Sequence, residues 1–161
     1  MEKSVSKNIP SAPDLDRRFM AHALNLARRG LGRVWPNPAV GCVLVAAGRV
    51  VGEGWTQPSG RPHAERVALD HAGAAANGAT AYVSLEPCSH HGKTPPCADA
   101  LIAAGVARVV VACGDPDARV SGRGLARLRD AGIAVAEGMM ATEAQRSMPG
   151  SSAESSVTGR G

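Results

Sequence analysis

The stretch that decides the fold runs from His63 to Cys97. It opens with His63-Ala64-Glu65 and closes with Pro87-Cys88-Ser89-His90-His91-Gly92-Lys93-Thr94-Pro95-Pro96-Cys97. One histidine and two cysteines can supply three ligands to a zinc ion, and a metal with three protein ligands keeps a fourth position for water. That open position is typical of a catalytic site. We therefore predict that His63, Cys88 and Cys97 bind one Zn²⁺.

Glu65 follows the histidine by two residues and is predicted to move protons for the metal-bound water. A helix is expected from Ala64 to about Ala76, which places Glu65 in its first turn. Free N–H groups there favour the ionised carboxylate. The pattern is similar to that of zinc deaminases, H-x-E followed by P-C-x-x-C with a glutamate that does not bind the metal. Here eight residues separate the two cysteines instead of two.

Outward from this stretch, apolar runs and turn residues predict an α/β chain. The expected strands are Val40–Ala46, Val50–Trp55, Thr80–Leu85, Val106–Ala112 and Ile133–Ala136. The expected helices run from an N-cap at Asp14 to Gly30, over Ala64–Ala76, from Pro95 to Ala104, and over about 123–131 and 137–148. The first two strands should form a hairpin. The order predicts a three-layer α/β/α sandwich around a five-stranded mixed sheet.

The length of 161 residues suits one domain, expected at 14–148. Residues 1–13 mix charge, Ser and Pro, and residues 149–161 are rich in Ser and Gly, so both are expected to be disordered tails. Residues 1–20 contain no apolar run of the kind found in signal peptides or membrane spans. We therefore expect a cytoplasmic protein without membrane contact, whose paired cysteines bind metal.

The net charge of +4 comes from basic residues that are scattered along the chain, and aromatic residues make up only 2%. This composition argues against a nucleic-acid surface and is compatible with a small anionic substrate.

Taken singly, each site residue would more often be structural, with the two cysteines as buried thiols. Cys42 and Cys113 lie inside apolar strands and are expected in the core. His22 and His71 are expected to be exposed or structural. His90 and His91 lie between the two cysteines, where either could compete for zinc, although contact with substrate is the favoured interpretation.

Several motifs together resemble the deaminase domain of the bifunctional riboflavin-biosynthesis protein, a pyrimidine deaminase of the cytidine-deaminase-like superfamily. They are Pro36-Asn37-Pro38-Ala39-Val40-Gly41-Cys42-Val43, the His63 triplet, the segment from Leu85 to Cys97, Asp115-Pro116 and Gly122-Arg123-Gly124-Leu125. The long spacing between the cysteines is the specific part. The resemblance covers about residues 17–148.

The resemblance implies a cytidine-deaminase-like fold and the hydrolysis of the 2-amino group of 2,5-diamino-6-(5-phosphoribosylamino)pyrimidin-4(3H)-one. It also implies substrate contacts at Asn37, His90 and Lys93, and assembly into homo-oligomers. Thr56 stands where the family usually has a substrate-binding His. The reductase domain that follows in the family is not in the sequence, so a separate reductase is a conceivable partner.

Two rival interpretations stay open. The first is a zinc deaminase of another aminopyrimidine or nucleotide, which Thr56 keeps open. The second is an inactive zinc-folded binding module, against which Glu65 stands because a structural zinc site does not need it.

Overall fold

A five-stranded mixed sheet forms the centre of the protein in the computed structural model, which describes residues 11–34, 38–89, 96–114 and 121–145. The strands are β1 (Gly41–Ala46), β2 (Arg49–Trp55), β3 (Thr80–Leu85), β4 (Arg108–Cys113) and β5 (Ala134–Glu137). The α-helices are α2 (Ala12–Arg28), α3 (Ala64–Ala72), α4 (Cys97–Ala103), α5 (Arg123–Asp130) and α6 (Ala141–Gln145).

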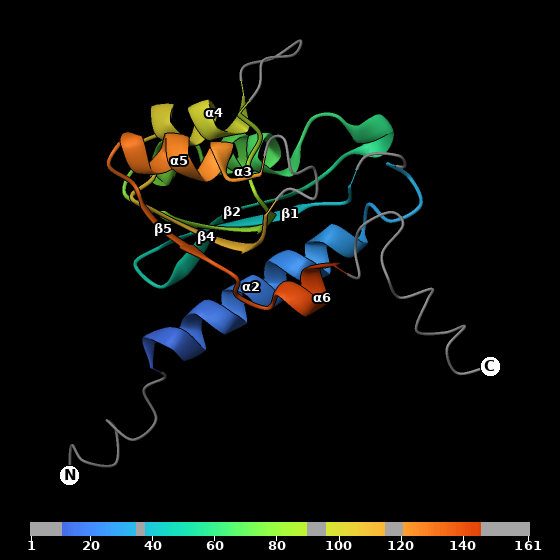
Figure 1. Ribbon diagram of the computed structural model, residues 1–161, viewed down its shortest axis with the longest axis horizontal. Helices are drawn as coiled ribbons and strands as arrows, with labels where there is room; N and C mark the ends of the chain where they lie inside the picture. Colours follow the sequence, from blue (N-terminus) through green and yellow to red (C-terminus); the bar gives the residue numbers. More distant parts are fainter. Residues whose placement is uncertain (1–10, 35–37, 90–95, 115–120, 146–161) are drawn as a thin grey trace.

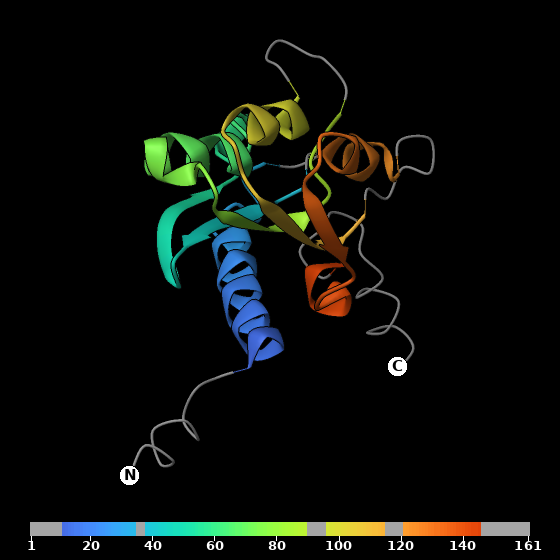
Figure 2. The same cartoon turned by 90° about the vertical axis from the view of Figure 1, so that its left-hand side faces the viewer.

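Helices cover both faces of the sheet. Figure 1 shows α3, α4 and α5 above it and α2 with α6 below it, and the turned view in Figure 2 keeps the same three layers. The strand order is β2-β1-β3-β4-β5, with β1 antiparallel to both its neighbours and β3, β4 and β5 parallel. The predicted three-layer sandwich with a five-stranded mixed sheet is therefore confirmed.

Strand β4 illustrates why the apolar runs predicted the layers. Val109, Val110 and Val111 are all completely buried, so this strand presents apolar side chains to both faces of the sheet. Continuous apolar runs are typical of parallel strands that helices cover on both sides.

Helix α2 begins at Ala12, so the expected N-cap at Asp14 is wrong. Ser11 is the N-cap, and its side chain accepts a hydrogen bond of 3.2 Å from the backbone N–H of Asp14. Serine and aspartate both cap helices well, and here Ser11 accepts a hydrogen bond from a free N–H group of the first turn. Asp14 then lies in the first turn, where a negative charge suits the helix field.

A buried polar network fixes α2 to the sheet. The Tyr82 hydroxyl donates a hydrogen bond of 2.6 Å to Asp16, and Arg108 donates two, of 3.0 and 2.7 Å, to the same carboxylate. Asp16 lies on α2, Tyr82 on β3 and Arg108 at the start of β4. The network therefore joins three elements that lie far apart in the sequence.

Helix α3 lies directly on the hairpin strand β2. A side-chain carbon at Gly52 would lie 2.4 Å from the carbonyl oxygen of Ala68, and one at Gly54 would lie 2.4 Å from that of Ala64. Only glycine permits this approach. Because α3 carries Glu65, these two glycines help to set the depth of that side chain.

The remaining boundaries move by a few residues from those predicted. Helix α3 ends at Ala72, and a 3-10 helix covers Gly73–Ala76, because Gly73 has a positive φ of 56° that an α-helix does not allow. The last helix covers only Ala141–Gln145 of the predicted 137–148, of which 146–148 lie outside the described residues. In the part of the chain that the structure describes, no helix combines the length and apolar character of a membrane span.

Candidate functional site

Three side chains that could hold a metal ion converge where β3 ends and two helices begin. His63 is the N-cap of α3, Cys88 follows β3, and Cys97 is the first residue of α4. The Nδ1 atom of His63 lies 3.3 Å from the Sγ of Cys97 and 4.0 Å from the Sγ of Cys88. The ligand atoms of all three lie within 4.8 Å of one another, so the predicted set is brought together.

The two thiols of this cluster differ in acidity. The hydrogen bond with the Cys97 side chain lowers the pKa of Cys88 to about 4, and bonds with His63 and the Cys97 backbone act in the same direction. The hydrogen bond with Cys88 raises the pKa of Cys97, and burial adds to that effect. The backbone N–H of Cys97 donates to the Cys88 sulfur over 3.2 Å. These contacts therefore favour negative charge on the Cys88 sulfur over the Cys97 sulfur.

The donor set fits zinc. Two cysteine sulfurs and one imidazole nitrogen are the ligands that zinc prefers, and three of them leave one position open. The surroundings stabilise negative charge on the Cys88 sulfur, and the thiolate is the form in which cysteine binds a metal. The N-terminal start of α4 also directs the backbone N–H of Cys97 at the Cys88 sulfur.

Glu65 lies beside this cluster and is only 4% exposed. Burial raises its pKa to about 7, while its own backbone N–H and the nearby His63 act in the opposite direction. The backbone N–H at the helix start thus favours the ionised form, but the loss of water outweighs it. A carboxyl group with this pKa can both accept and donate a proton near neutral pH.

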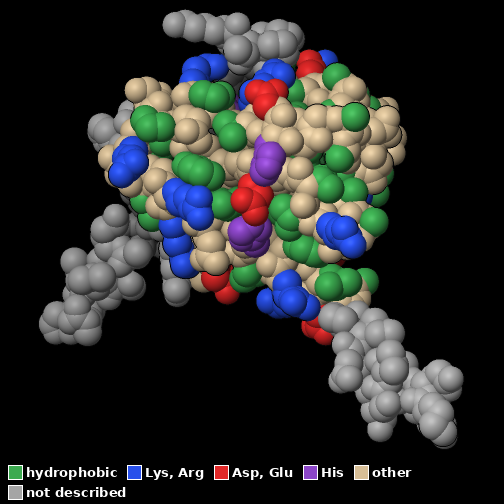
Figure 3. Space-filling view, turned by 180° about the vertical axis from the view of Figure 1, so that it is seen from behind, with side chains coloured by type: hydrophobic (Ala, Val, Ile, Leu, Met, Phe, Trp, Pro, Cys, Tyr) green, Lys and Arg blue, Asp and Glu red, His purple; other side chains and the backbone are tan. Residues whose placement is uncertain are grey.

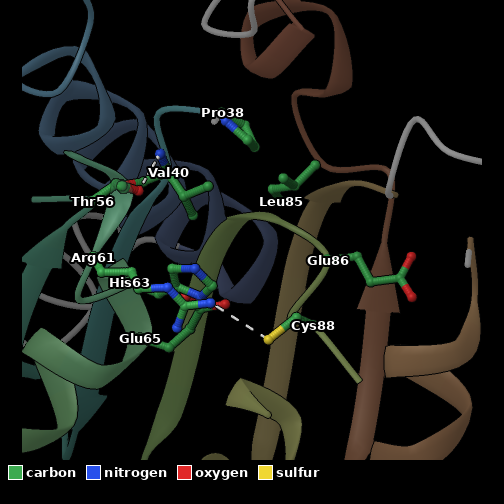
Figure 4. A pocket seen from close by; sticks show the side chains of 10 residues that line it. Pro38, Val40, Thr56, Arg61, His63, Glu65, Leu85, Glu86 and Cys88 are labelled. Atoms are coloured by element: carbon green, nitrogen blue, oxygen red, sulfur yellow. Dashed lines mark hydrogen bonds between the residues drawn. The ribbon is translucent and has the colours of Figure 1, made fainter. Parts of the chain in front are cut away.

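A cavity of about 220 Å³ opens over the cluster. Figure 4 shows His63, Glu65 and Cys88 together in it, with Arg61 beside His63 and with Pro38, Val40 and Leu85 across from them. The other lining residues are Thr56, Gly60 and Glu86. The cavity thus has apolar side chains on one side and the titratable side chains of His63, Glu65 and Cys88 on the other, a combination common in ligand pockets.

Thr56 lies in the wall of the cavity and is 3% exposed. Its hydroxyl oxygen accepts a hydrogen bond of 3.0 Å from the backbone N–H of Val40, and the hydroxyl is 3.4 Å from the Val40 carbonyl. The Thr56 hydroxyl thus binds the Val40 backbone and links two segments that line the cavity.

Two side chains of this region, Arg61 and Glu86, were not predicted from the sequence. Arg61 lines the cavity two residues before His63, and its place beside a predicted ligand was the available signal. Glu86 is buried, and its carboxylate binds backbone N–H groups of residues 122 and 124, which no local pattern indicates. The predicted substrate contacts Asn37, His90 and Lys93 lie outside the described residues.

Cys42, Cys113, His22 and His71 are structural, as predicted. Cys42 and Cys113 are buried in β1 and β4. His22 lies 2.6 Å from the carboxylate of Glu53, and the ring of His71 accepts a hydrogen bond of 3.0 Å from the Glu53 backbone.

Comparisons with known proteins agree with this geometry. Residues 13–113 match the family model of the cytidine and deoxycytidylate deaminase zinc-binding region. The chain is 61% identical over 131 residues to riboflavin biosynthesis protein RibD of Escherichia coli, covering 81% of this chain and 36% of that protein. It thus spans about a third of the length of the RibD relatives that it matches.

A shorter relative matches almost over its whole length. The diaminohydroxyphosphoribosylamino-pyrimidine deaminase of Buchnera aphidicola is 48% identical over 131 residues, which cover 81% of this chain and 89% of that protein. Among solved structures, RibD of Acinetobacter baumannii superposes with a TM-score of 0.83 at 50% identity, covering 85% of this chain and 39% of that one.

Proposed function

Because the chain belongs to the cytidine and deoxycytidylate deaminase zinc-binding family, we propose that it is a riboflavin-pathway deaminase. The reaction replaces the 2-amino group of 2,5-diamino-6-(5-phosphoribosylamino)pyrimidin-4(3H)-one by oxygen. The products are 5-amino-6-(5-phosphoribosylamino)uracil and ammonia. The observation that carries the proposal is the buried Glu65 beside the His63, Cys88 and Cys97 cluster at the floor of one cavity.

His63, Cys88 and Cys97 would hold the zinc, which supplies a Lewis-acidic position where water loses a proton near neutral pH. Glu65 accepts that proton and passes it to the ring nitrogen next to the reacting carbon. The remaining hydroxide oxygen bonds to the amine-bearing carbon. Glu65 then takes the second proton from the hydroxyl group on that carbon and donates it to the leaving amine. The carbon–nitrogen bond breaks, ammonia departs, and the carbonyl oxygen remains on the ring. Burial raises the pKa of Glu65, which suits a group that must hold a proton in one step and release it in the next.

The rest of the cavity orients the substrate in this proposal. The apolar side chains of Val40 and Leu85 face the cavity and can flank an aromatic ring. Asn37, His90 and Lys93 contact the substrate, with the compact Lys93 ammonium suited to a phosphate or a ring carbonyl.

We extend the proposal to the substrate class, the assembly, the partner and the compartment of the protein. The proposed substrate is a small phosphorylated pyrimidine, the proposed assembly is a homo-oligomer, and the proposed partner is a separate reductase that acts on the product. Scattered Lys and Arg side chains on the face in Figure 3 support the exclusion of nucleic acid, since they do not form a basic stripe. Four free thiols suit a reducing cytoplasm.

The test is ammonia release by purified, zinc-loaded protein from a panel of substrates. The panel contains the diaminopyrimidine phosphate, its dephosphorylated form, cytidine and dCMP. We expect turnover of the diaminopyrimidine phosphate. Mass spectrometry should show a product in which oxygen has replaced the amino group. Turnover of cytidine or dCMP alone would favour a deaminase of another pyrimidine, and zinc binding without any turnover would favour a binding module.

A further inference from the structure

We propose that Glu86 is a positioning residue of the zinc site, which holds the Cys88 segment in place by binding the start of helix α5. The inference uses the zinc site of the proposed function but concerns how that site is built. Figure 4 shows the Glu86 carboxylate pointing away from the cavity and from Cys88. Glu86 therefore lines the cavity without directing its carboxylate into it.

The carboxylate caps α5 from another part of the chain. Its Oε1 accepts a hydrogen bond of 3.0 Å from the N–H of Gly122, and its Oε2 accepts one of 2.8 Å from the N–H of Gly124. The helix begins at Arg123, and its own N-cap, Gly122, has no side chain to offer. A negative charge at a helix N-terminus satisfies free N–H groups and complements the helix field.

The contact continues into the backbone next to Cys88. A side-chain carbon at Gly124 would lie 2.0 Å from the carbonyl oxygen of Pro87, so α5 packs directly on this peptide group. The backbone N–H of Glu86 donates to the carbonyl of Cys113 over 3.0 Å at the end of β4. Residues 86 and 87 are thus fixed from two sides before the chain reaches Cys88.

Helix α5 is also bound to the second cysteine segment. Arg127 of α5 forms an ion pair with Asp99, which lies two residues after Cys97 on α4. The backbone N–H of Ala98 donates to the carbonyl of Cys88 over 3.0 Å, which joins the two cysteine segments to each other. A helix without a metal ligand therefore contacts both segments that carry the sulfurs.

The chemistry requires a carboxylate at position 86. Two oxygens accept from two N–H groups at once, whereas a glutamine offers one acceptor oxygen and no charge. In Glu86→Gln, one N–H at the start of α5 loses its partner, and the Cys88 segment is less firmly held. Changes to residues that orient metal ligands typically weaken metal affinity by about 10–100-fold.

Zinc affinity, measured by competition with a chromophoric chelator, tests the proposal without using turnover. We expect Glu86→Gln to weaken zinc binding by about 10–100-fold. The matched control is Glu137→Gln, since Glu137 also binds α5, through Arg129 at 3.0 Å, but at the end far from the cysteines. The control should bind zinc as tightly as the unaltered protein, because its exposed ion pair touches neither cysteine segment and such pairs contribute little.

A spectroscopic signature separates positioning from a general loss of stability. In the cobalt-substituted protein, the visible absorption bands report the ligand geometry, and Glu86→Gln should shift them while Glu137→Gln should not. Unchanged affinity and an unchanged cobalt spectrum in Glu86→Gln would overturn the proposal.

A second variant covers the case in which Glu86→Gln does not fold. Arg127→Ala removes an exposed side chain from the same helix and should weaken zinc binding by about two- to fivefold. If Glu86→Gln cannot be purified and Arg127→Ala binds zinc as tightly as the unaltered protein, the proposal is wrong. Absence of zinc binding in the unaltered protein would instead contradict the proposed function.

Discussion

The imidazole Nδ1 of His63 lies 3.3 Å from the sulfur of Cys97, although 34 positions separate the two residues in the sequence. One residue precedes α3 and the other begins α4, so the start of each helix delivers one ligand. Cys88 completes the set from the end of β3. The central sheet is thus what brings the three donor atoms to one place.

Replacing a proposed ligand should remove the metal. We expect Cys97→Ser to lose its zinc and to unfold at a lower temperature, because a metal that binds only the folded state stabilises it. Metal content and thermal unfolding with and without a chelator measure both effects. The chelator should lower the midpoint of the unaltered protein but not that of the variant. Cys113→Ala is the control, and one zinc per chain in Cys97→Ser would refute the ligand set.

A methyl group at position 54 should displace helix α3, which carries Glu65. In Gly54→Ala the new carbon would lie 2.4 Å from the Ala64 carbonyl oxygen, so α3 must move. We expect a loss of about 1–3 kcal/mol in the free energy of unfolding, measured by chemical denaturation. Gly114→Ala is the control, since its new carbon would meet atoms at 3.5 Å, an ordinary contact. Equal stability of the two variants would contradict this account.

The hydroxyl of Thr56 should matter for stability. Thr56→Val keeps the shape of the side chain but leaves the buried N–H of Val40 without its acceptor. The expected cost is roughly 1–3 kcal/mol in the free energy of unfolding. Thr80→Val, at the start of β3, serves as the comparison. If both variants unfold alike, the hydrogen bond to Val40 contributes nothing of note.

Asp16 should make the fold sensitive to acid. The hydrogen bond with Arg108 lowers its pKa, burial opposes this, and the bond from Tyr82 lowers it further. Because the folded state has the lower pKa, the stabilisation is fully present above the ordinary value of about 4 and is lost as the pH falls through the folded value.

As the pH drops below the ordinary carboxyl pKa of about 4, the unfolding midpoint of the unaltered protein should therefore fall more steeply than that of Asp16→Asn. Asp70→Asn, on the exposed side of α3, should follow the unaltered protein. Parallel curves for the unaltered protein and Asp16→Asn would show that the network contributes nothing to acid sensitivity.

Much of the fold and the metal cluster could be predicted because the signals are local. Apolar runs of the β3 and β4 type predict covered strands, and the spacing of His63, Glu65, Cys88 and Cys97 predicts zinc chemistry. The start of α2 was harder, since Ser11 and Asp14 are both good N-caps and only the folded backbone selects between them.

The role of Glu86 could not be predicted, because its partners lie 36 and 38 positions away and are backbone groups of glycines. The raised pKa of Glu65 could not be predicted from the sequence either. The sequence indicates the helix field, whereas the burial that outweighs it depends on β2, α3 and the sulfur ligands packing around one side chain.

Glu65 is proposed to transfer the protons in a zinc-dependent deamination. The most direct measurement is ammonia release from the diaminopyrimidine phosphate by zinc-loaded Glu65→Gln beside the unaltered protein, with zinc content determined in both. We expect the variant to keep one zinc and to lose turnover by about 10²–10⁴-fold, the usual contribution of a general acid and base. Normal ammonia release by the variant would contradict the account, because another group would then be moving the protons.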